Sequence, residues 1–439
     1  MKKSRWNVYY LKIKNQIYTY QSMEECNLNS EFSFENGDRF VIANTFSKCV
    51  IELDKIHYDA FIYDEYETIK EDVEILKNQG ILVNDKYDEV GYLRQLRSQY
   101  AFDNKTATMI ICPTLECNFK CPYCYETRKS GYMSQETQQE LLFFYKNLLK
   151  KGLQHLNVTW YGGEPLLYPD IIEYLSKQMI SIAKQYNSDI SFSMISNGYC
   201  ISDNIISIFK EINLKTIQIT LDGGPEVHDS RRVLINGLPT FNIIKKNIQK
   251  LAKENINVKI RVNLDKSNQN EFNKIKGMFL DCNDNISIYP AIVTKEKNQT
   301  DNIRNNCFNA GEEKNIILSN YITFPKDYEQ LGSCTIVCSG EHINSFVITP
   351  EGKLYKCLND IGIASKSIGI LTNFNLYLDT NYANEYIYRD PFTESECEKC
   401  PYLPLCYGAC LNEYIKNGKH NCVPNRYFFD EISKGLIND

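Results

Sequence analysis

The sequence lacks the features of several protein classes. It contains no apolar run that approaches the length of a membrane-spanning helix. Its formal net charge of -6 offers no basic surface for nucleic acid. The first ten residues, MKKSRWNVYY, carry basic side chains but no apolar core or small-residue cleavage site behind them, so we expect no signal peptide. These absences predict a cytoplasmic protein that binds neither a membrane nor nucleic acid.

Cysteine, by contrast, is abundant, with 17 residues in a chain of 439. Because nothing indicates export, disulfides are not expected, and cysteines in a reducing compartment are more often metal ligands or catalytic groups. Eleven of them lie in two groups, three over residues 117–124 and eight over 334–422. The six scattered cysteines are expected to be small buried side chains: Cys26, Cys49, Cys112, Cys200, Cys282 and Cys307.

Hydrophobic patterning divides the chain into four parts. Residues 1–104 combine short strands (8–14, 39–43, 48–53) with helical spacing over 54–78 and 86–100, which predicts a winged-helix-like domain. Residues 293–333 are rich in Asn and Lys with weak periodicity and are interpreted as a bridge. Residues 334–439 are dense in cysteine, with short strands over 345–357 around a Pro-Glu-Gly turn.

The remaining part, residues 105–292, alternates strand and helix. β-branched runs predict six strands, at 107–112, 157–162, 190–196, 216–222, 258–264 and 286–292. Helical stretches separate them, at 134–151, 170–186, 202–212, 240–254 and 270–280. Six such units predict an α/β fold with a parallel sheet, either open or curled into a partial (βα)6 barrel. In such sheets the chemistry gathers at the C-terminal ends of the strands.

The first cysteine group follows the first of these strands. Cys117, Cys121 and Cys124 lie within eight residues and could hold one metal centre, one thiolate short of the four that saturate a cubane iron–sulfur cluster. A structural zinc knuckle is the alternative, but it normally closes with a fourth Cys or His. The closest downstream histidine, His155, lies at the next predicted strand.

This CxxxCxxC spacing, with Tyr123 before the last cysteine, resembles the motif of the radical SAM superfamily. The resemblance implies a [4Fe–4S] cluster whose open iron chelates S-adenosylmethionine (SAM). Reductive cleavage of SAM would then release a 5′-deoxyadenosyl radical. In such enzymes the cofactor does the difficult chemistry, while the protein supplies orientation and shielding.

Other strand ends agree with this resemblance. Gly162, Gly163 and Glu164 resemble the GGE motif that meets the methionine amine. Ser196 and Asn197 end the third strand, where the family often holds the ribose, and Thr220 and Asp222 end the fourth. Arg232 and Arg261 are candidates to pair with the SAM carboxylate, with a surface salt bridge as the alternative for either. Together with Tyr123, these residues are the predicted SAM contacts.

The second cysteine group resembles the SPASM domain throughout, and Cys334 adds an eighth cysteine to its seven-cysteine pattern. Zinc ribbons also use paired cysteines and are the alternative. The resemblance implies two further [4Fe–4S] clusters, hence three in all. The first auxiliary cluster would use Cys334, Cys338, Cys357 and Cys410, and the second Cys397, Cys400, Cys406 and Cys422. With Cys334 as its fourth ligand, the first auxiliary cluster would conduct electrons rather than bind substrate. Cys307 is the candidate to replace Cys334 as that ligand.

SPASM proteins mostly modify peptides or proteins, and the whole chain resembles the streptide-type maturases that cross-link lysine to tryptophan in ribosomally made peptides. The long N-terminal part would then bind a leader peptide along a strand edge; a decorative or dimerising domain is the alternative. A carbon–carbon cross-link in a precursor peptide is therefore the expected product. The expected electron donor is a flavodoxin or ferredoxin.

Three other possibilities remain open at this point. A maturase of this type could form a thioether instead of a carbon–carbon bond. A sulfatase-maturase-like enzyme would oxidise a single residue, although those enzymes place the cysteine motif close to the N-terminus. A metal-binding scaffold without catalysis would release no 5′-deoxyadenosine. The base that takes the substrate proton cannot be read from the sequence.

Overall fold

The computed structural model describes residues 1–13, 16–22, 38–279, 285–295, 299–309, 312–320, 338–372, 375–378, 380–418, 422 and 424–438. The chain forms two compact units, which are described separately. The larger contains residues 102–322 and 339–389, and the smaller contains residues 1–101 and 390–439 together with Cys338. Within the described ranges, no helix is long and apolar enough to cross a membrane.

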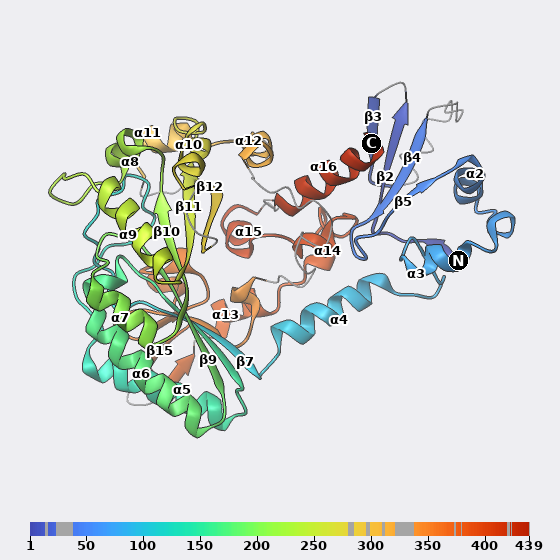
Figure 1. Ribbon diagram of the computed structural model, residues 1–439. Helices are drawn as coiled ribbons and strands as arrows, with labels where there is room; N and C mark the ends of the chain where they lie inside the picture. Colours follow the sequence, from blue (N-terminus) through green and yellow to red (C-terminus); the bar gives the residue numbers. More distant parts are fainter. Residues whose placement is uncertain are drawn as a thin grey trace. The chain divides into compact units, whose positions relative to one another are not determined.

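The larger unit is built on a ten-stranded mixed sheet (Figure 1). Six strands that follow one another in the sequence run parallel, in the order β12-β11-β10-β9-β8-β7. Their bounds are β7 (Thr106–Ile111), β8 (His155–Trp160), β9 (Asp189–Ser196), β10 (Leu214–Leu221), β11 (Asn257–Leu264) and β12 (Ile286–Ile292). All six were predicted, so the parallel α/β sheet expected from the sequence is confirmed.

Helices separate these strands as the helical spacing predicts. They are α5 (Gln135–Lys150), α6 (Pro169–Gln185), α7 (Asp203–Glu211), α9 (Phe241–Lys253) and α10 (Glu271–Met278). Ser134 and Ser202 begin two of them, because each side chain accepts a hydrogen bond from a backbone N–H in the first turn. The short helices η2 (Pro165–Leu167) and α8 (Pro225–Arg231) were not predicted.

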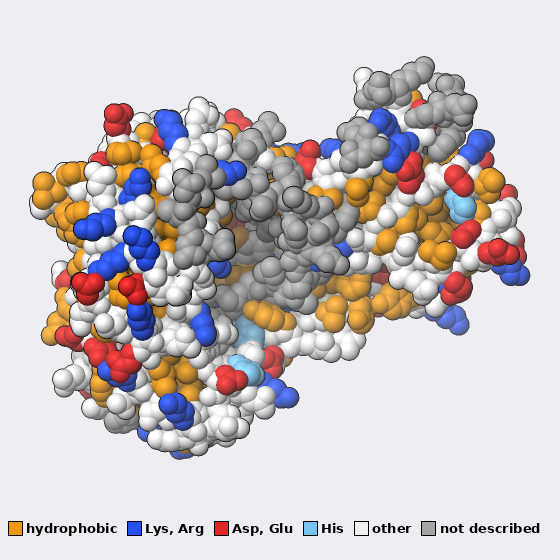
Figure 2. Space-filling model, in the orientation of Figure 1, with side chains coloured by type: hydrophobic (Ala, Val, Ile, Leu, Met, Phe, Trp, Pro, Cys, Tyr) orange, Lys and Arg blue, Asp and Glu red, His pale blue; other side chains and the backbone are white. Residues whose placement is uncertain are grey.

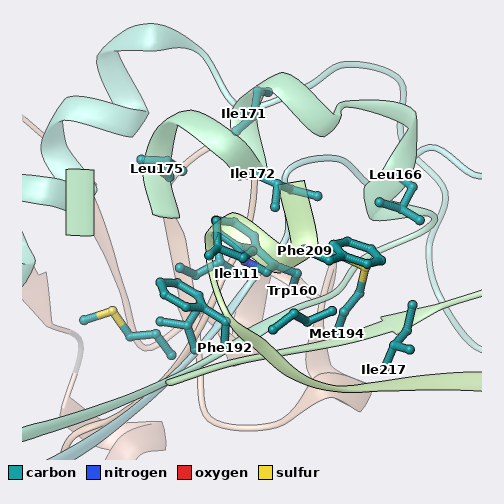
Figure 3. Close-up of a cluster of buried hydrophobic side chains, with 14 of the residues drawn as sticks. Ile111, Trp160, Leu166, Ile171, Ile172, Leu175, Phe192, Met194, Phe209 and Ile217 are labelled. Carbon is teal, nitrogen blue, oxygen red and sulfur yellow. The ribbon is translucent and has the colours of Figure 1, made fainter. Parts of the chain in front are cut away.

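The core of this unit lies between the sheet and its helices (Figure 3). Trp160 from β8, with Phe192 and Met194 from β9, packs with Leu175 of α6 and Phe209 of α7. Each of these side chains is at most 2% exposed. The packed core holds the strand ends, and with them the loops that carry the predicted site, in a fixed arrangement.

The sheet continues beyond β7 into residues that the sequence assigned to the cysteine-rich part. Strand β13 (Ser345–Ile348) pairs parallel to β7, and β14 (Lys353–Tyr355), β15 (Gly369–Thr372) and β16 (Asn375–Leu378) follow antiparallel. The predicted hairpin over 345–357 is confirmed, with Gly352 in its turn at φ +76°. The unit also contains η4 (Ser339–Glu341), η5 (Leu358–Asp360), η6 (Ala364–Lys366) and α13 (Thr380–Ile387).

The part interpreted as a bridge contains two helices that its weak periodicity did not reveal. They are α11 (Asp301–Asn306) and α12 (Glu313–Asn320). The side chain of Thr300 accepts a hydrogen bond from the backbone of Ile303 and begins α11. This helix therefore owes its position to its cap and to packing rather than to an apolar stripe.

The smaller unit contains an antiparallel sheet of order β3-β2-β4-β5. The strands are β2 (Asn7–Ile13), β3 (Gln16–Tyr20), β4 (Arg39–Asn44) and β5 (Val50–Leu53), and β1 (Lys2–Lys3) pairs with β6 (Leu82–Val83). Its helices are α2 (Lys55–Tyr63), η1 (Tyr66–Ile69), α3 (Val73–Asn78), α4 (Glu89–Ala101), η7 (Pro391–Thr393), α14 (Leu403–Cys406), α15 (Leu411–Asn417) and α16 (Pro424–Asn438).

Within this unit the two ends of the chain come together. Tyr10 of β2 donates a hydrogen bond of 2.9 Å to Asp430 of α16, and Tyr402 donates to the same carboxylate. The continuous helical spacing predicted over 54–78 is broken after α2, where Asp64 adopts a left-handed conformation. Whether the N-terminal part is a winged helix stays a prediction, as do the sequence-based domain boundaries.

Candidate functional site

The loops that follow the parallel strands of the larger unit enclose a cavity of about 250 Å³. The three cysteines of the first group line it: Cys117, Cys121 and Cys124. Eight of the ten predicted SAM contacts also line it: Tyr123, Gly162, Gly163, Ser196, Asn197, Thr220, Arg232 and Arg261. Residues from five strand ends therefore meet where a parallel sheet is expected to hold its chemistry.

The loop over residues 117–124, here called the cysteine loop, is held by hydrogen bonds of its own backbone. Cys124 donates a backbone hydrogen bond to the carbonyl of Cys121, and the Cys117 sulfur accepts one from the backbone of Phe119. Burial raises the pKa of all three thiols, and that of Cys117 to about 12. A thiolate at these positions would therefore need a nearby positive charge, such as that of a bound metal, to stabilise it.

Gly162 and Gly163 allow the loop after β8 to lie directly against the cysteine loop. A Cβ at Gly162 would stand 2.2 Å from the carbonyl oxygen of Thr114, and one at Gly163 would stand 2.1 Å from that of Glu116. No side chain fits at such distances, so these glycines are required for the approach of the two loops. The sequence predicted an approach to the cofactor; the structure shows an approach to the cysteine loop as well.

Glu164 is fully buried and does not line the cavity. Its carboxylate accepts hydrogen bonds from the hydroxyl of Ser196 at 2.9 Å and from the backbone of Asn197 at 2.7 Å. Burial raises the pKa of Glu164, although these hydrogen bonds oppose the shift. In this arrangement the carboxylate fixes the end of β9, and through it the two residues expected near the ribose.

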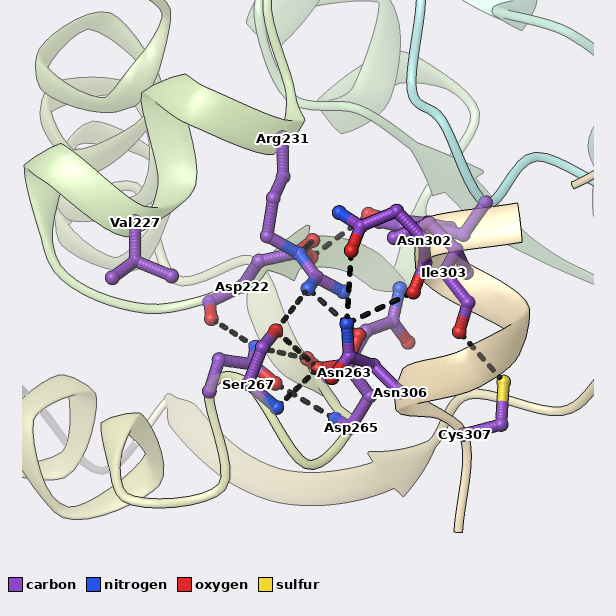
Figure 4. A network of polar contacts seen from close by, with 12 residues as sticks. Asp222, Val227, Arg231, Asn263, Asp265, Ser267, Asn302, Ile303, Asn306 and Cys307 are labelled. Carbon is purple, nitrogen blue, oxygen red and sulfur yellow. Dashed lines mark hydrogen bonds and ion pairs between the residues drawn. The ribbon is translucent and has the colours of Figure 1, made fainter. Parts of the chain in front are cut away.

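A buried network links the cysteine motif to the end of β10 through Tyr123. Figure 4 shows the part of this network around Asp222, Arg231 and Asp265. Tyr123 donates a hydrogen bond of 2.8 Å to Asp222 and accepts one of 2.6 Å from Arg232. Arg231 lies between Asp222, at 2.9 Å from its Nε, and Asp265, at 2.7 Å from its Nη1. Asp222 is fully buried and lies behind the cavity wall, where it orients Tyr123.

Another part of the lining comes from β10 and β11. Arg261 donates a hydrogen bond of 2.8 Å from Nε to Asn263 two residues along the strand, and both side chains line the cavity. Gln218 also lines it and accepts a hydrogen bond of 2.6 Å from Tyr289. Arg232 donates to Tyr123 of the cysteine motif, whereas Arg261 donates to Asn263 on its own strand, so the two predicted arginines are held by different segments of the lining.

Several cavity residues escaped the sequence analysis. Glu126, Gln218, Asn263 and Gln299 are among them, and Glu126 has a pKa that burial raises to about 7. Side chains two residues apart on a strand lie on the same face of the sheet. This rule could have indicated Gln218 from Thr220 on β10, and Asn263 from Arg261 on β11. Gln299 donates hydrogen bonds to the carbonyls of Tyr123 and Thr294. No sequence pattern indicates Gln299, since it lies in the weakly periodic bridge.

The C-terminal cysteines divide between the two units. Cys357 belongs to the larger unit, and the other described members belong to the smaller one: Cys338, Cys397, Cys400, Cys406, Cys410 and Cys422. Burial and the charges of Cys400 and Cys422 raise the pKa of Cys406 to about 11, so these three thiols are close enough to interact. Cys334, like Cys26 and Cys282, lies outside the described residues.

The donor set fits an iron–sulfur cluster. Three partly buried thiols line one cavity, and Cys thiolates are the ligands that such clusters use. Among the described residues, no three Cys, His, Asp or Glu side chains are grouped as ligands of a metal ion. Thiolates around a four-iron cluster stand farther apart than those around a single ion, so this observation concerns a mononuclear site.

Comparisons with known proteins bear on this geometry. Residues 111–277 match the family model described as the radical SAM superfamily. The chain is 24% identical over 376 residues to the cysteine-type anaerobic sulfatase-maturating enzyme of Clostridium novyi, a match that covers 75% of this chain and 96% of that protein. The matched domain includes the cysteine loop and the ends of β8, β9 and β10.

Two solved structures share the fold. The structure described as native anSMEcpe with bound AdoMet and Kp18Cys peptide is 20% identical, with a TM-score of 0.59 over 76% of this chain and 98% of that one. Streptococcus suis SuiB bound to precursor peptide SuiA is 15% identical, with a TM-score of 0.52 over 90% of this chain and 96% of that one. The α/β fold predicted from the sequence is thereby confirmed.

Proposed function

We propose, from the premise that residues 111–277 are a radical SAM domain, that this enzyme modifies a ribosomally made precursor peptide at the cavity described above. The observation that carries the proposal is the meeting of Cys117, Cys121 and Cys124 with the ends of the parallel strands in one cavity. A cavity of this kind can shield a reactive radical from solvent and hold it against a chosen carbon.

In this proposal the three thiols hold a [4Fe–4S] cluster, and SAM lies against the walls formed by β8, β9 and β10. When bound, these groups supply a 5′-deoxyadenosyl radical that removes a hydrogen atom from the substrate. Arg232 would meet the SAM carboxylate, because Tyr123 holds its guanidinium at the cavity wall. Ser196 and Asn197 would position the ribose, held in place by the Glu164 carboxylate.

The proposed product is a carbon–carbon cross-link between two residues of the peptide, of the lysine–tryptophan type. The feature that favours this type is coverage: the SuiB structure with its precursor peptide matches 90% of this chain at a TM-score of 0.52, and the anSMEcpe structure matches 76% at a TM-score of 0.59. We assign leader binding to the N-terminal part. The eight C-terminal cysteines would carry two auxiliary clusters, which take up the electron released when the new bond forms.

Oxidation of a single residue is a second candidate. It is favoured by the match to nearly the whole length of the Clostridium novyi sulfatase-maturating enzyme. This candidate predicts an aldehyde in the product, whereas a cross-link predicts a cyclic peptide. A thioether, the third possibility, would consume a cysteine of the substrate.

The test is anaerobic incubation of the enzyme with SAM, a reductant and the peptide encoded by a short reading frame beside the gene. Loss of two hydrogens, with any cysteines still open to alkylation and a segment silent in tandem fragmentation, supports a carbon–carbon cross-link. The same loss with a blocked cysteine indicates a thioether, and a carbonyl-reactive product indicates single-residue oxidation. The absence of 5′-deoxyadenosine under these conditions would refute the proposed chemistry altogether.

A further inference from the structure

A short hairpin between α8 and α9 pairs with the cysteine loop. The backbone of Lys120 donates a hydrogen bond of 3.0 Å to the carbonyl of Val233, and Ile235 donates one of 2.9 Å to the carbonyl of Asn118. These bonds flank the bridge between Phe119 and Leu234. The hairpin is therefore bonded to the residues that lie between Cys117 and Cys121, so it joins the protein surface to two ligands of the proposed cluster.

The outer side of this hairpin is apolar and exposed. Ile235 is 60% exposed and Leu238 is 55% exposed, and Ile243 in the first turn of α9 is 42% exposed. Figure 2 shows hydrophobic side chains gathered where the α8–α9 loop projects from the larger unit. We call the surface formed by residues 235–246 the hairpin face. Branched apolar side chains gathered on such a tip favour contact with a partner.

The charge of this segment is also unusual for the chain. Residues 231–253 contain six basic residues and no acidic one, although the whole chain carries a net charge of -6. Arg231 and Arg232 are buried, whereas Lys246 is exposed beside Ile243 on the surface of α9. In the described part of the chain, Lys250 pairs with Asp203, and no ion pair is found for Lys245 or Lys246.

The acidic groups of the neighbouring helix do not cancel this charge. Asp229 of α8 accepts hydrogen bonds from the backbone of Thr240 and Phe241, so its carboxylate is directed at the start of α9. Glu226, at the start of α8, is exposed and lies near Lys274, whose pKa is raised mainly by its hydrogen bond to Glu271 and also by the charge of Glu226. The hairpin face thus presents apolar side chains beside lysines, which suits an acidic partner.

We propose that the hairpin face is the docking surface for a small acidic electron carrier of the flavodoxin class. This inference rests on the proposed function, because a radical SAM cluster must receive one electron for each cleavage of SAM. In the transfer, the carrier is oxidised by one electron, the cluster is reduced by that electron, and no bond forms or breaks. The backbone hydrogen bonds to the cysteine loop give the electron a short bonded path from this surface.

The test compares two double variants with the same change of charge. In the first, Lys245→Glu and Lys246→Glu reverse the charge of the hairpin face. In the control, Lys150→Glu and Lys151→Glu make the same change at the C-terminal end of α5. A third variant, Ile235→Ser with Leu238→Ser, removes the apolar tip without touching a buried side chain. The probe is a purified flavodoxin in its fully reduced form, used with the cluster-loaded enzyme.

Two measurements are made: binding of flavodoxin by calorimetry, and oxidation of the reduced flavodoxin by stopped-flow absorbance. We expect the face variants to bind more weakly and to slow the second-order reaction about tenfold at low ionic strength. At high salt the rate of the charge-reversed variant should approach that of the wild type, because salt screens both the attraction of flavodoxin to the lysines and its repulsion by the glutamates. The control should match the wild type. Equal slowing in the control, or unchanged binding in both face variants, would overturn the proposal.

Dithionite separates this inference from the proposed function. As a small reductant it needs no docking surface, so all variants should release 5′-deoxyadenosine with dithionite at the rate of the wild type. If the wild type itself releases none, the proposed chemistry fails, and the binding isotherms still decide whether the hairpin face holds flavodoxin. If sedimentation shows that the face variants lose self-association instead of flavodoxin binding, the face joins two copies of the chain and the proposal is wrong.

Discussion

Replacing Asp222 with asparagine should destabilise the larger unit through the network drawn in Figure 4. Asp222 is fully buried and accepts hydrogen bonds from Tyr123 and from Arg231. An asparagine has nearly the same shape, but it is neutral and turns an N–H2 group toward one of these two donors. Arg231 would keep Asp265 as its only carboxylate partner among the described residues.

The magnitude follows from the burial of the charges. Removing one partner of a buried ion pair costs about 3–5 kcal/mol, and the retained contact with Asp265 places this change at about 3 kcal/mol. For a unit of this size, each kcal/mol lowers the melting temperature by roughly 2–4 °C, so Asp222→Asn should lower it by about 6–12 °C. Because Tyr123 also loses an acceptor, Arg232 should be less well held and SAM should bind more weakly.

The assay is thermal unfolding of the anaerobically purified protein followed by near-ultraviolet circular dichroism, with SAM affinity measured by equilibrium dialysis. Asp189→Asn is the matched control, because Asp189 is 86% exposed and, among the described residues, its one ion pair is with the half-exposed His155 at the surface. A melting temperature for Asp222→Asn within about 2 °C of the control would refute the reasoning, since the network would then contribute little to stability.

Three further predictions follow from other parts of the structure. Gly163→Ala should destabilise the larger unit by roughly 1–3 kcal/mol, because its Cβ would stand 2.1 Å from the carbonyl oxygen of Glu116. Gly277→Ala in α10 should be neutral or stabilising by about 0.5–1 kcal/mol, because the added Cβ meets open space. Denaturant unfolding of the two variants measures the difference. Cys117→Ala should reduce the iron content of reconstituted protein by about four atoms per chain, while Cys49→Ala, in the smaller unit, should leave it unchanged. His57 has a pKa raised by Asp72 and Asp54, so its contribution to stability is fully present below the unfolded pKa of about 6.5 and is lost as the pH rises through the folded pKa. The smaller unit should accordingly melt at a slightly higher temperature at pH 6 than at pH 8, and a pH dependence unchanged in His57→Asn would contradict this assignment.

The sequence by itself determined the strands and helices of the parallel sheet and the loops that carry most of the candidate site. Strand and helix periods are local properties, so the six parallel strands could be predicted from short windows of sequence. Because the C-terminal ends of parallel strands meet at one edge, the positions of the cysteine loop, Gly162, Ser196 and Thr220 in the chain sufficed to place them at one cavity. The binding roles assigned to these residues remain predictions.

Only the tertiary structure decided where individual side chains point and which distant segments pair. Glu164 lies at a strand end as predicted, but packing turns its carboxylate toward Ser196 and Asn197. The pairing of β13 with β7 joins residues more than two hundred positions apart, and Asp430 meets Tyr10 from the other end of the chain. Such contacts depend on the packing of many side chains at once, which no local period encodes.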